Sequence, residues 1–114
     1  MRQLFSSGSP YEPIVGYSRA VRVGNVVEVA GTTAQDGPVV TGDAFAQIKR
    51  VLEKIGEVLQ AAGASFEHVV RTRLFVTDIA QWEAIGRVTS MVEVKVLFDP
   101  QMLVEIEATA IISA

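Results

Sequence analysis

Three segments in the second half of the chain alternate apolar and charged residues with a period of two. Successive side chains of a β-strand point to opposite faces, so each segment is predicted to be a strand with one apolar and one charged face. The apolar face is expected to carry Val70, Thr72, Leu74, Val76, Val92, Val94, Val96, Val104, Ile106, Ala108 and Ala110. The opposite face is expected to carry Arg71, Arg73, Phe75, Met91, Glu93, Lys95, Glu105, Glu107 and Thr109. The apolar face needs a second layer to cover it.

That second layer is predicted to be helical. Apolar residues recur at three- and four-residue spacing from about Asp43 to Ala62, with Thr41 or Asp43 able to cap the start and Gly63 placed for a left-handed C-cap. The buried side of this helix is expected to hold Phe45, Ile48, Leu52, Ile55, Leu59 and Ala62. A second, shorter helix is predicted around Ala80–Arg87, because a sequence similar to a capping box precedes it.

The remaining segments complete an α+β pattern. Gly24 and Asn25 separate two β-prone runs, and because both residues tolerate positive φ they predict a tight hairpin. Strands are expected at Gln3–Ser6, Ser18–Val23, Val26–Gly31, Val69–Thr77, Ser90–Leu97 and Met102–Ile112, and loops at Thr32–Gly42 and Phe98–Pro100. We therefore predict one domain, residues 1–114, in which two helices pack on one face of a sheet, with Phe45 and Trp82 in the core.

Composition removes several classes of function. The chain has 114 residues, a net charge of −3 with scattered basic residues, no cysteine and a single histidine, His68, which is expected at the surface. A nucleic-acid binder usually shows a basic stripe, and zinc and thiolate sites need Cys or clustered His, so we expect no nucleic-acid partner and no metal or other cofactor. No apolar run is long enough to span a bilayer or form a signal peptide, so we expect no membrane partner and a cytoplasmic protein.

The charged face of the sheet has two interpretations. It is either a solvated face, which is common in α+β domains, or a surface that packs against other copies of the chain. The second interpretation is favoured by charges of both signs, by Phe75 and Met91 among them, and by the 49% of hydrophobic residues in so short a chain.

Several blocks together resemble the RidA (YjgF/YER057c/UK114) family over nearly the whole chain. They are Gly16-Tyr17-Ser18, Val23-Gly24-Asn25, Val29-Ala30-Gly31, Ala61-Ala62-Gly63, Val69–Asp78, Met91-Val92-Glu93-Val94 and Val104-Glu105-Ile106-Glu107-Ala108. The resemblance implies a chorismate-mutase-like fold and a homotrimer whose sheets form an inner barrel, with small-molecule clefts between subunits. It also implies hydrolysis of reactive enamines and imines to ketoacids and ammonia.

The resemblance also assigns site residues. Glu105 matches the catalytic glutamate that positions or activates water, Tyr17 matches the cleft tyrosine, and Gly31 matches a glycine whose backbone approaches the ligand. Thr32, beside Gly31, and Met91 are further candidates for substrate binding. The alternatives are an ion pair of Glu105 with Arg71 or Arg73, ordinary packing for Tyr17, and no ligand role for Thr32 at a strand end.

The chain departs from the family pattern beside the cleft. The deaminase branch has an arginine just before the Met91 block that clamps the substrate carboxylate; here that position is Thr89, and the nearest arginine is Arg87. Arg87 either replaces this clamp or is an exposed cation at a helix C-terminus. The stretch before the block is also about a dozen residues short, close to the minimum for a parallel crossover. It is either a true deletion between residues 86 and 90 or a loop that the printed sequence omits.

Three functions remain. The first is a deaminase-like hydrolase acting on a small imine or carbonyl compound other than the usual amino-acid-derived imine. The second is a noncatalytic trimer that binds a small metabolite. The third, a nuclease or translation inhibitor, is disfavoured by the acidic balance and by the lack of a histidine pair.

Overall fold

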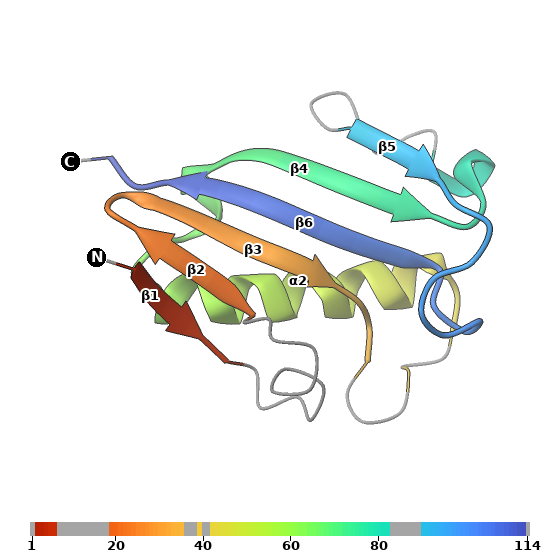
Figure 1. The fold of residues 1–114 in the computed structure, drawn as a ribbon. Coiled ribbons are helices and arrows are strands. Elements are labelled where there is room, and N and C mark those ends of the chain that lie inside the picture. The colour runs from red at the N-terminus through yellow and green to blue at the C-terminus, as the bar shows by residue number, and fades with distance from the viewer. Residues whose placement is uncertain (1, 7–18, 36–38, 40–41, 83–89, 114) are drawn as a thin grey trace.

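A single mixed sheet of six strands forms the body of the molecule, and one long helix packs across its back (Figure 1). The computed structural model describes residues 2–6, 19–35, 39, 42–82 and 90–113. The strands are β1 (Arg2–Phe5), β2 (Ala20–Val23), β3 (Val26–Thr32), β4 (Val69–Val76), β5 (Ser90–Glu93) and β6 (Val104–Ile111). Their order in the sheet is β1-β2-β3-β6-β4-β5, with β4 and β5 parallel and the other pairs antiparallel. The predicted α+β class is confirmed.

The β2–β3 hairpin forms where the sequence predicts it. Val23 pairs with Val26, and Gly24 takes a φ of 60°, the left-handed conformation that a tight turn requires. The last strand, β6, lies between β3 and β4, so it is central in the sheet. This arrangement places the charged side chains of β6 in the middle of the open face.

The helix α2 (Ala44–Ala61) covers the other face of the sheet. Its start is capped by Asp43, whose carboxylate accepts a hydrogen bond of 2.9 Å from the Ala46 N–H, and Gly63 follows its end with a φ of 85°. Its buried side packs on β3 and β6 through Gln47, Val51, Ile55, Val58 and Leu59. Both predicted caps are therefore confirmed.

The predicted buried side of α2 was partly wrong. Phe45 is 73% exposed and Leu52 is 42% exposed, whereas Ile55 and Leu59 are buried as expected. Residues turn by about 100° each in a helix, so the buried stripe through Val51 and Ile55 leaves Leu52 on its flank. Phe45 was also predicted to be a core residue, and the structure contradicts this.

Two strand assignments also need correction. A register shift between Val69 and Arg71 turns Val69 toward the core and leaves Val70 60% exposed. In β5, Met91 pairs with Leu74 and packs against the core, while Val92 is 47% exposed. The faces of β5 are thus the reverse of those predicted, and the strand ends at Glu93 instead of Leu97.

The second predicted helix is described only at its start. Ile79–Trp82 forms a 3-10 helix, η2, and Asp78 accepts a hydrogen bond of 3.2 Å from the Ala80 N–H, while residues 83–87 lie outside the described part of the chain. Another 3-10 helix, η1 (Phe66–His68), precedes β4. Within the described ranges α2 is the one α-helix, and none of the helices there is long and apolar enough to cross a membrane.

Candidate functional site

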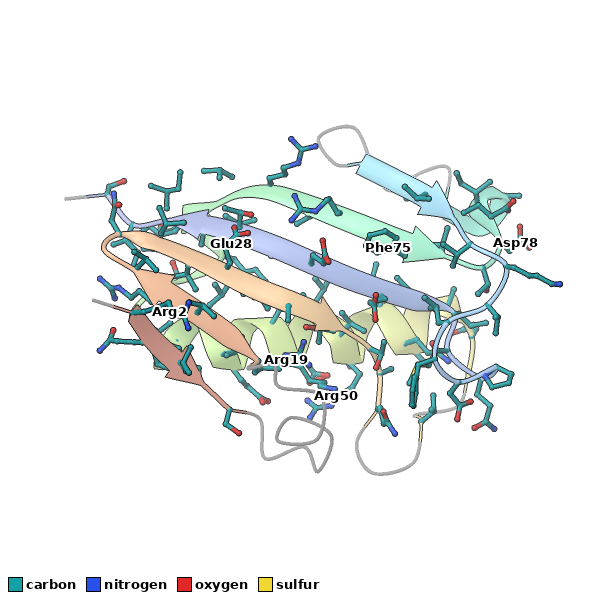
Figure 2. All side chains as sticks on the ribbon, in the orientation of Figure 1. Arg2, Arg19, Glu28, Arg50, Phe75 and Asp78 are labelled. Carbon is teal, nitrogen blue, oxygen red and sulfur yellow. The ribbon has the colours of Figure 1, made fainter. Side chains whose placement is uncertain are left out.

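The open face of the sheet carries acidic and basic side chains from its three central strands. Figure 2 views this face, with Glu28 on β3 and Phe75 on β4 labelled. Arg73 on β4 and Glu107 on β6 form an ion pair, with 2.7 Å between Nε and Oε1, and the side chains are 36% and 33% exposed. The hydrogen bond to Glu107 raises the pKa of Arg73 above its ordinary value. This pairing across strands matches the predicted mixture of arginines and glutamates on the face.

Glu105 lies on the same face of the sheet, two residues before Glu107 on β6. It pairs with Phe75 on β4. Its carboxyl group is half-buried, and this burial raises its pKa, because removal from water disfavours the charged form. The negative charge of Glu107 raises the pKa further, and the positive charge of Arg19 lowers it. Arg73 was one of the two arginines considered as an ion-pair partner of Glu105. In the structure Arg73 bonds to Glu107, so the surroundings of Glu105 differ from those of this cross-strand ion pair.

Gly31 lies directly against the Glu105 carboxyl group. A Cβ atom added at Gly31 would be 2.8 Å from the Cδ of Glu105 and 3.0 and 3.1 Å from its two oxygens. Only a residue without a side chain allows this approach, since real Cβ atoms essentially never come nearer than 3.0 Å. The position also falls in an irregular part of β3, where the register with β6 shifts between Val29 and Thr32.

Arg19 completes the described surroundings of Glu105. Its guanidinium donates a hydrogen bond of 2.5 Å from Nη2 to the carbonyl oxygen of Gly31, and its own carbonyl accepts one of 3.0 Å from the Ala30 N–H. Arg19 is only 9% exposed, which is unusual for a guanidinium. Arg19 was not among the predicted site residues, and its position directly after the Gly16-Tyr17-Ser18 block is the one signal in the sequence that points to it.

The predicted site residues are only partly brought together. The structure brings Glu105 and Gly31 together, so two of the residues that the resemblance assigns to the cleft are neighbours. Thr32 is completely buried, pairs with Ile106, and donates a hydrogen bond of 2.9 Å from its hydroxyl to the Ala30 carbonyl. Met91 lies on the helix side of the sheet, so its predicted position on the open face was wrong. The remaining candidates, Tyr17, Arg87 and Thr89, lie outside the described residues.

This arrangement suits acid–base chemistry. A carboxylate whose pKa is raised can take a proton from water and return it, and the glycine backbone allows the carboxyl group to lie close against β3. In the described part of the chain no three Asp, Glu or His side chains gather in a way that could hold a metal ion.

Comparison with known proteins identifies the family. The model of the family described as endoribonuclease L-PSP matches residues 8–112. A RutC family protein of Pyrococcus abyssi is 38% identical over 90 residues, which cover 76% of this chain and 70% of that protein. A 2-iminobutanoate/2-iminopropanoate deaminase of Rattus norvegicus is 31% identical over 91 residues, 77% of this chain and 66% of that protein.

Solved structures agree with this result. The crystal structure of Rv2704 from Mycobacterium tuberculosis, described as a member of the highly conserved YjgF/YER057c/UK114 family, has a TM-score of 0.85 and 46% sequence identity, with 98% of this chain and 100% of that chain covered. A protein of unknown function from Pseudomonas aeruginosa has a TM-score of 0.81 and 30% identity, with 97% and 92% covered. The chain therefore belongs to the RidA (YjgF/YER057c/UK114) family, the family that the matching model describes as endoribonuclease L-PSP.

Proposed function

We propose that this protein hydrolyses small reactive imines or enamines to carbonyl compounds and ammonia, with Glu105 as the general base. The observation that carries the proposal is the Glu105 carboxyl group, half-buried on the open face of the sheet, with a raised pKa and the backbone of Gly31 against it. The relative from Rattus norvegicus, named as a 2-iminobutanoate/2-iminopropanoate deaminase, gives the reaction class its support.

The reaction divides into two proton transfers. The Glu105 carboxylate removes a proton from a water molecule while the water oxygen attacks the imine carbon, and the imine nitrogen takes up a proton to give a carbinolamine. The protonated carboxyl group then supplies its proton to the amine nitrogen, and the C–N bond breaks to release ammonia. As the C=O bond forms, the hydroxyl proton passes to solvent, which replaces the proton that the imine nitrogen took from solvent in the first step. An enamine enters the same sequence after protonation on carbon. A carboxyl group serves both steps best when its pKa lies close to the working pH.

The substrate we propose is not the usual amino-acid-derived imine. The deaminase branch uses an arginine to clamp the substrate carboxylate, and this chain has Thr89 at that position. A bidentate guanidinium contributes both charge and geometry to such a site, and threonine offers neither. We therefore propose that the substrate is a small imine or enamine whose binding does not depend on that clamp. We also propose that the protein is cytoplasmic.

We also propose that three copies assemble through the open sheet face, so that the cleft beside Glu105 lies between subunits. Large apolar side chains are exposed on this face, next to its charges: Leu4, Val23, Val92 and Ile111. Exposed apolar surface of this kind marks interaction sites. Light scattering should give a mass of about 37 kDa, three times the 12.3 kDa chain, and a 12.3 kDa particle at micromolar concentration would end the assembly proposal.

The reaction is tested with a panel of imines generated in place. An amino-acid dehydratase or oxidase produces each imine, semicarbazide traps what remains, and the purified protein should reduce the trapped fraction. Glu105→Gln should abolish this effect, whereas Glu53→Gln, a matched change at an exposed carboxylate on the outer side of α2, should not. Turnover that survives Glu105→Gln would remove the mechanism, and no effect on any imine would remove the hydrolase and favour the noncatalytic metabolite binder.

A further inference from the structure

Arg19 is a nearly buried cation beside the candidate base, and the family resemblance gives it no role. It immediately precedes β2, next to the segment of β3 that carries Gly31. Burying a guanidinium costs free energy unless hydrogen bonds and charges compensate for the lost water. A guanidinium at the protein surface would avoid this cost. The hydrogen bonds and charges around Arg19 must therefore compensate for its burial.

The contacts of Arg19 lead to Glu105 through a single residue. The guanidinium donates a hydrogen bond to the carbonyl oxygen of Gly31. Gly31 in turn lies against Glu105, because a Cβ atom added at Gly31 would be within 3.1 Å of both carboxyl oxygens. The backbone of this segment is held a second time, because the Ala30 N–H donates to the Arg19 carbonyl. Arg19 therefore forms hydrogen bonds with the backbone on both sides of this segment, with the Ala30 N–H and with the carbonyl oxygen of Gly31.

We propose that Arg19 is a positioning residue for Glu105, which fixes the Gly31 backbone against the carboxyl group and provides a buried positive charge beside it. The positive charge of Arg19 also acts on the Glu105 pKa, which it lowers against the combined effects of burial and Glu107. The charge of Arg19 thus favours the ionised form of the carboxyl group, which is the form that accepts a proton from water. This inference rests on the proposed function only in that Glu105 is taken as the acting group.

Other charged groups lie on the same face of the sheet as Glu105, and their effects must be separated from that of Arg19. They are Glu107 on the same strand, Glu28 on β3, and Arg71 and Arg73 on β4. Arg73 is bonded to Glu107 at 2.7 Å, and the contribution of this pair is present in every Arg19 variant. A change at Arg19 alone therefore leaves these groups as a constant background.

The test is an NMR titration of the Glu105 side-chain carboxyl carbon, assigned through the Glu105→Gln variant. Arg19→Gln should move the titration midpoint upward by more than the fitting error, and it should shift the carbonyl carbon resonance of Gly31. Arg22→Gln is the matched control, because Arg22 lies within β2, close to Arg19 in the chain, and also donates to a backbone carbonyl, that of Ala62 just after α2, at 2.6 Å. It should lower stability but leave both Glu105 and Gly31 signals in place.

A folded Arg19→Gln protein with an unchanged Glu105 midpoint overturns the proposal, and so does an equal shift in Arg22→Gln. If Arg19→Gln does not fold, Arg19→Lys carries the test. It keeps the charge but loses the planar guanidinium, so it should move the Gly31 carbonyl resonance while shifting the Glu105 midpoint little. The titration needs no substrate, so a protein without imine turnover can still support this inference, and an active one can still refute it.

Discussion

Replacing Gly31 with alanine should damage the site while leaving the fold almost unchanged. The added Cβ would be 2.8 Å from the Glu105 Cδ, and ordinary contact begins at 3.4 Å, so the carboxyl group must retreat by about 0.6 Å. Displacements of about 1 Å in catalytic geometry cost about 100-fold in rate. We therefore expect a 10- to 100-fold loss in kcat/KM for imine hydrolysis, with the displacement of Glu105 visible as a change in its carboxyl carbon resonance.

The stability of the Gly31→Ala variant should stay close to that of the wild type. Gly31 does not have a left-handed φ, so alanine fits its backbone and gains about 0.4–1 kcal/mol through the unfolded state. Moving the Glu105 side chain off its preferred rotamer costs about 0.5–1.5 kcal/mol, and the two terms nearly cancel. Urea denaturation should therefore give a change within about 1 kcal/mol.

Gly56→Ala provides the matched control. A Cβ at Gly56 would also meet a side-chain atom at 2.8 Å, in this case the Cε2 of Phe66, but this ring is 52% exposed and can turn outward. The change is in the interior of α2, where alanine is favoured over glycine by about 1 kcal/mol. Turnover should be unchanged. Equal losses of activity in the two variants, or full activity in Gly31→Ala, would refute the role assigned to the contact with Glu105.

Three further predictions concern stability. Because burial raises the pKa of Glu105, its stabilising effect is present below the unfolded-state pKa and is lost as the pH rises through the folded-state pKa. Glu105→Gln should therefore gain stability relative to wild type in urea titrations as the pH rises above about 4.3, the ordinary pKa of glutamate, and a difference that does not change with pH would contradict this. Gln47→Leu should lower the free energy of unfolding by about 2–5 kcal/mol, measured by denaturation. The buried amide of Gln47 donates a hydrogen bond of 2.7 Å to the carbonyl of Gln101 and accepts one of 2.8 Å from the Leu103 N–H, and both backbone groups would lose their partner. A double-mutant cycle of Arg73→Ala and Glu107→Ala should give a coupling of only about 0.2–1 kcal/mol that decreases in 1 M salt, because both side chains are about one-third exposed; a coupling that salt does not change would point to a buried pair.

Period-two and helical patterns predicted where the elements lie better than which face each residue takes. Alternation placed Leu74, Val76 and Ile106 in the core correctly. It failed at Val70, because the register shift beside it inserts an extra residue that no alternation pattern reveals. It failed in β5 because a valine and a methionine are equally suited to a core, so composition alone did not show which of the two alternating sets faces α2.

The site was predicted to a similar extent. The family resemblance assigns both Glu105 and Gly31 to the cleft, and the structure adds that the two residues lie against each other. Arg19 could not be predicted, since arginines near a strand are usually solvated and burial is a property of the folded chain. The position of Thr32 was also beyond the sequence, because the irregular register of β3 turns its side chain to the buried side.

The central position of β6 has a consequence for how the chain folds. β6 follows every other strand in the sequence, yet it is the only link between the β1-β2-β3 group and the β4-β5 pair in the described sheet. The two groups cannot join during synthesis until β6 has emerged, and its pairings with β3 bring together residues far apart in the chain, which slows folding. Glu105 is carried by this same strand. An unfinished chain therefore exposes two open sheet edges for chaperones to protect, and the reactive carboxyl group enters its environment only when the sheet closes.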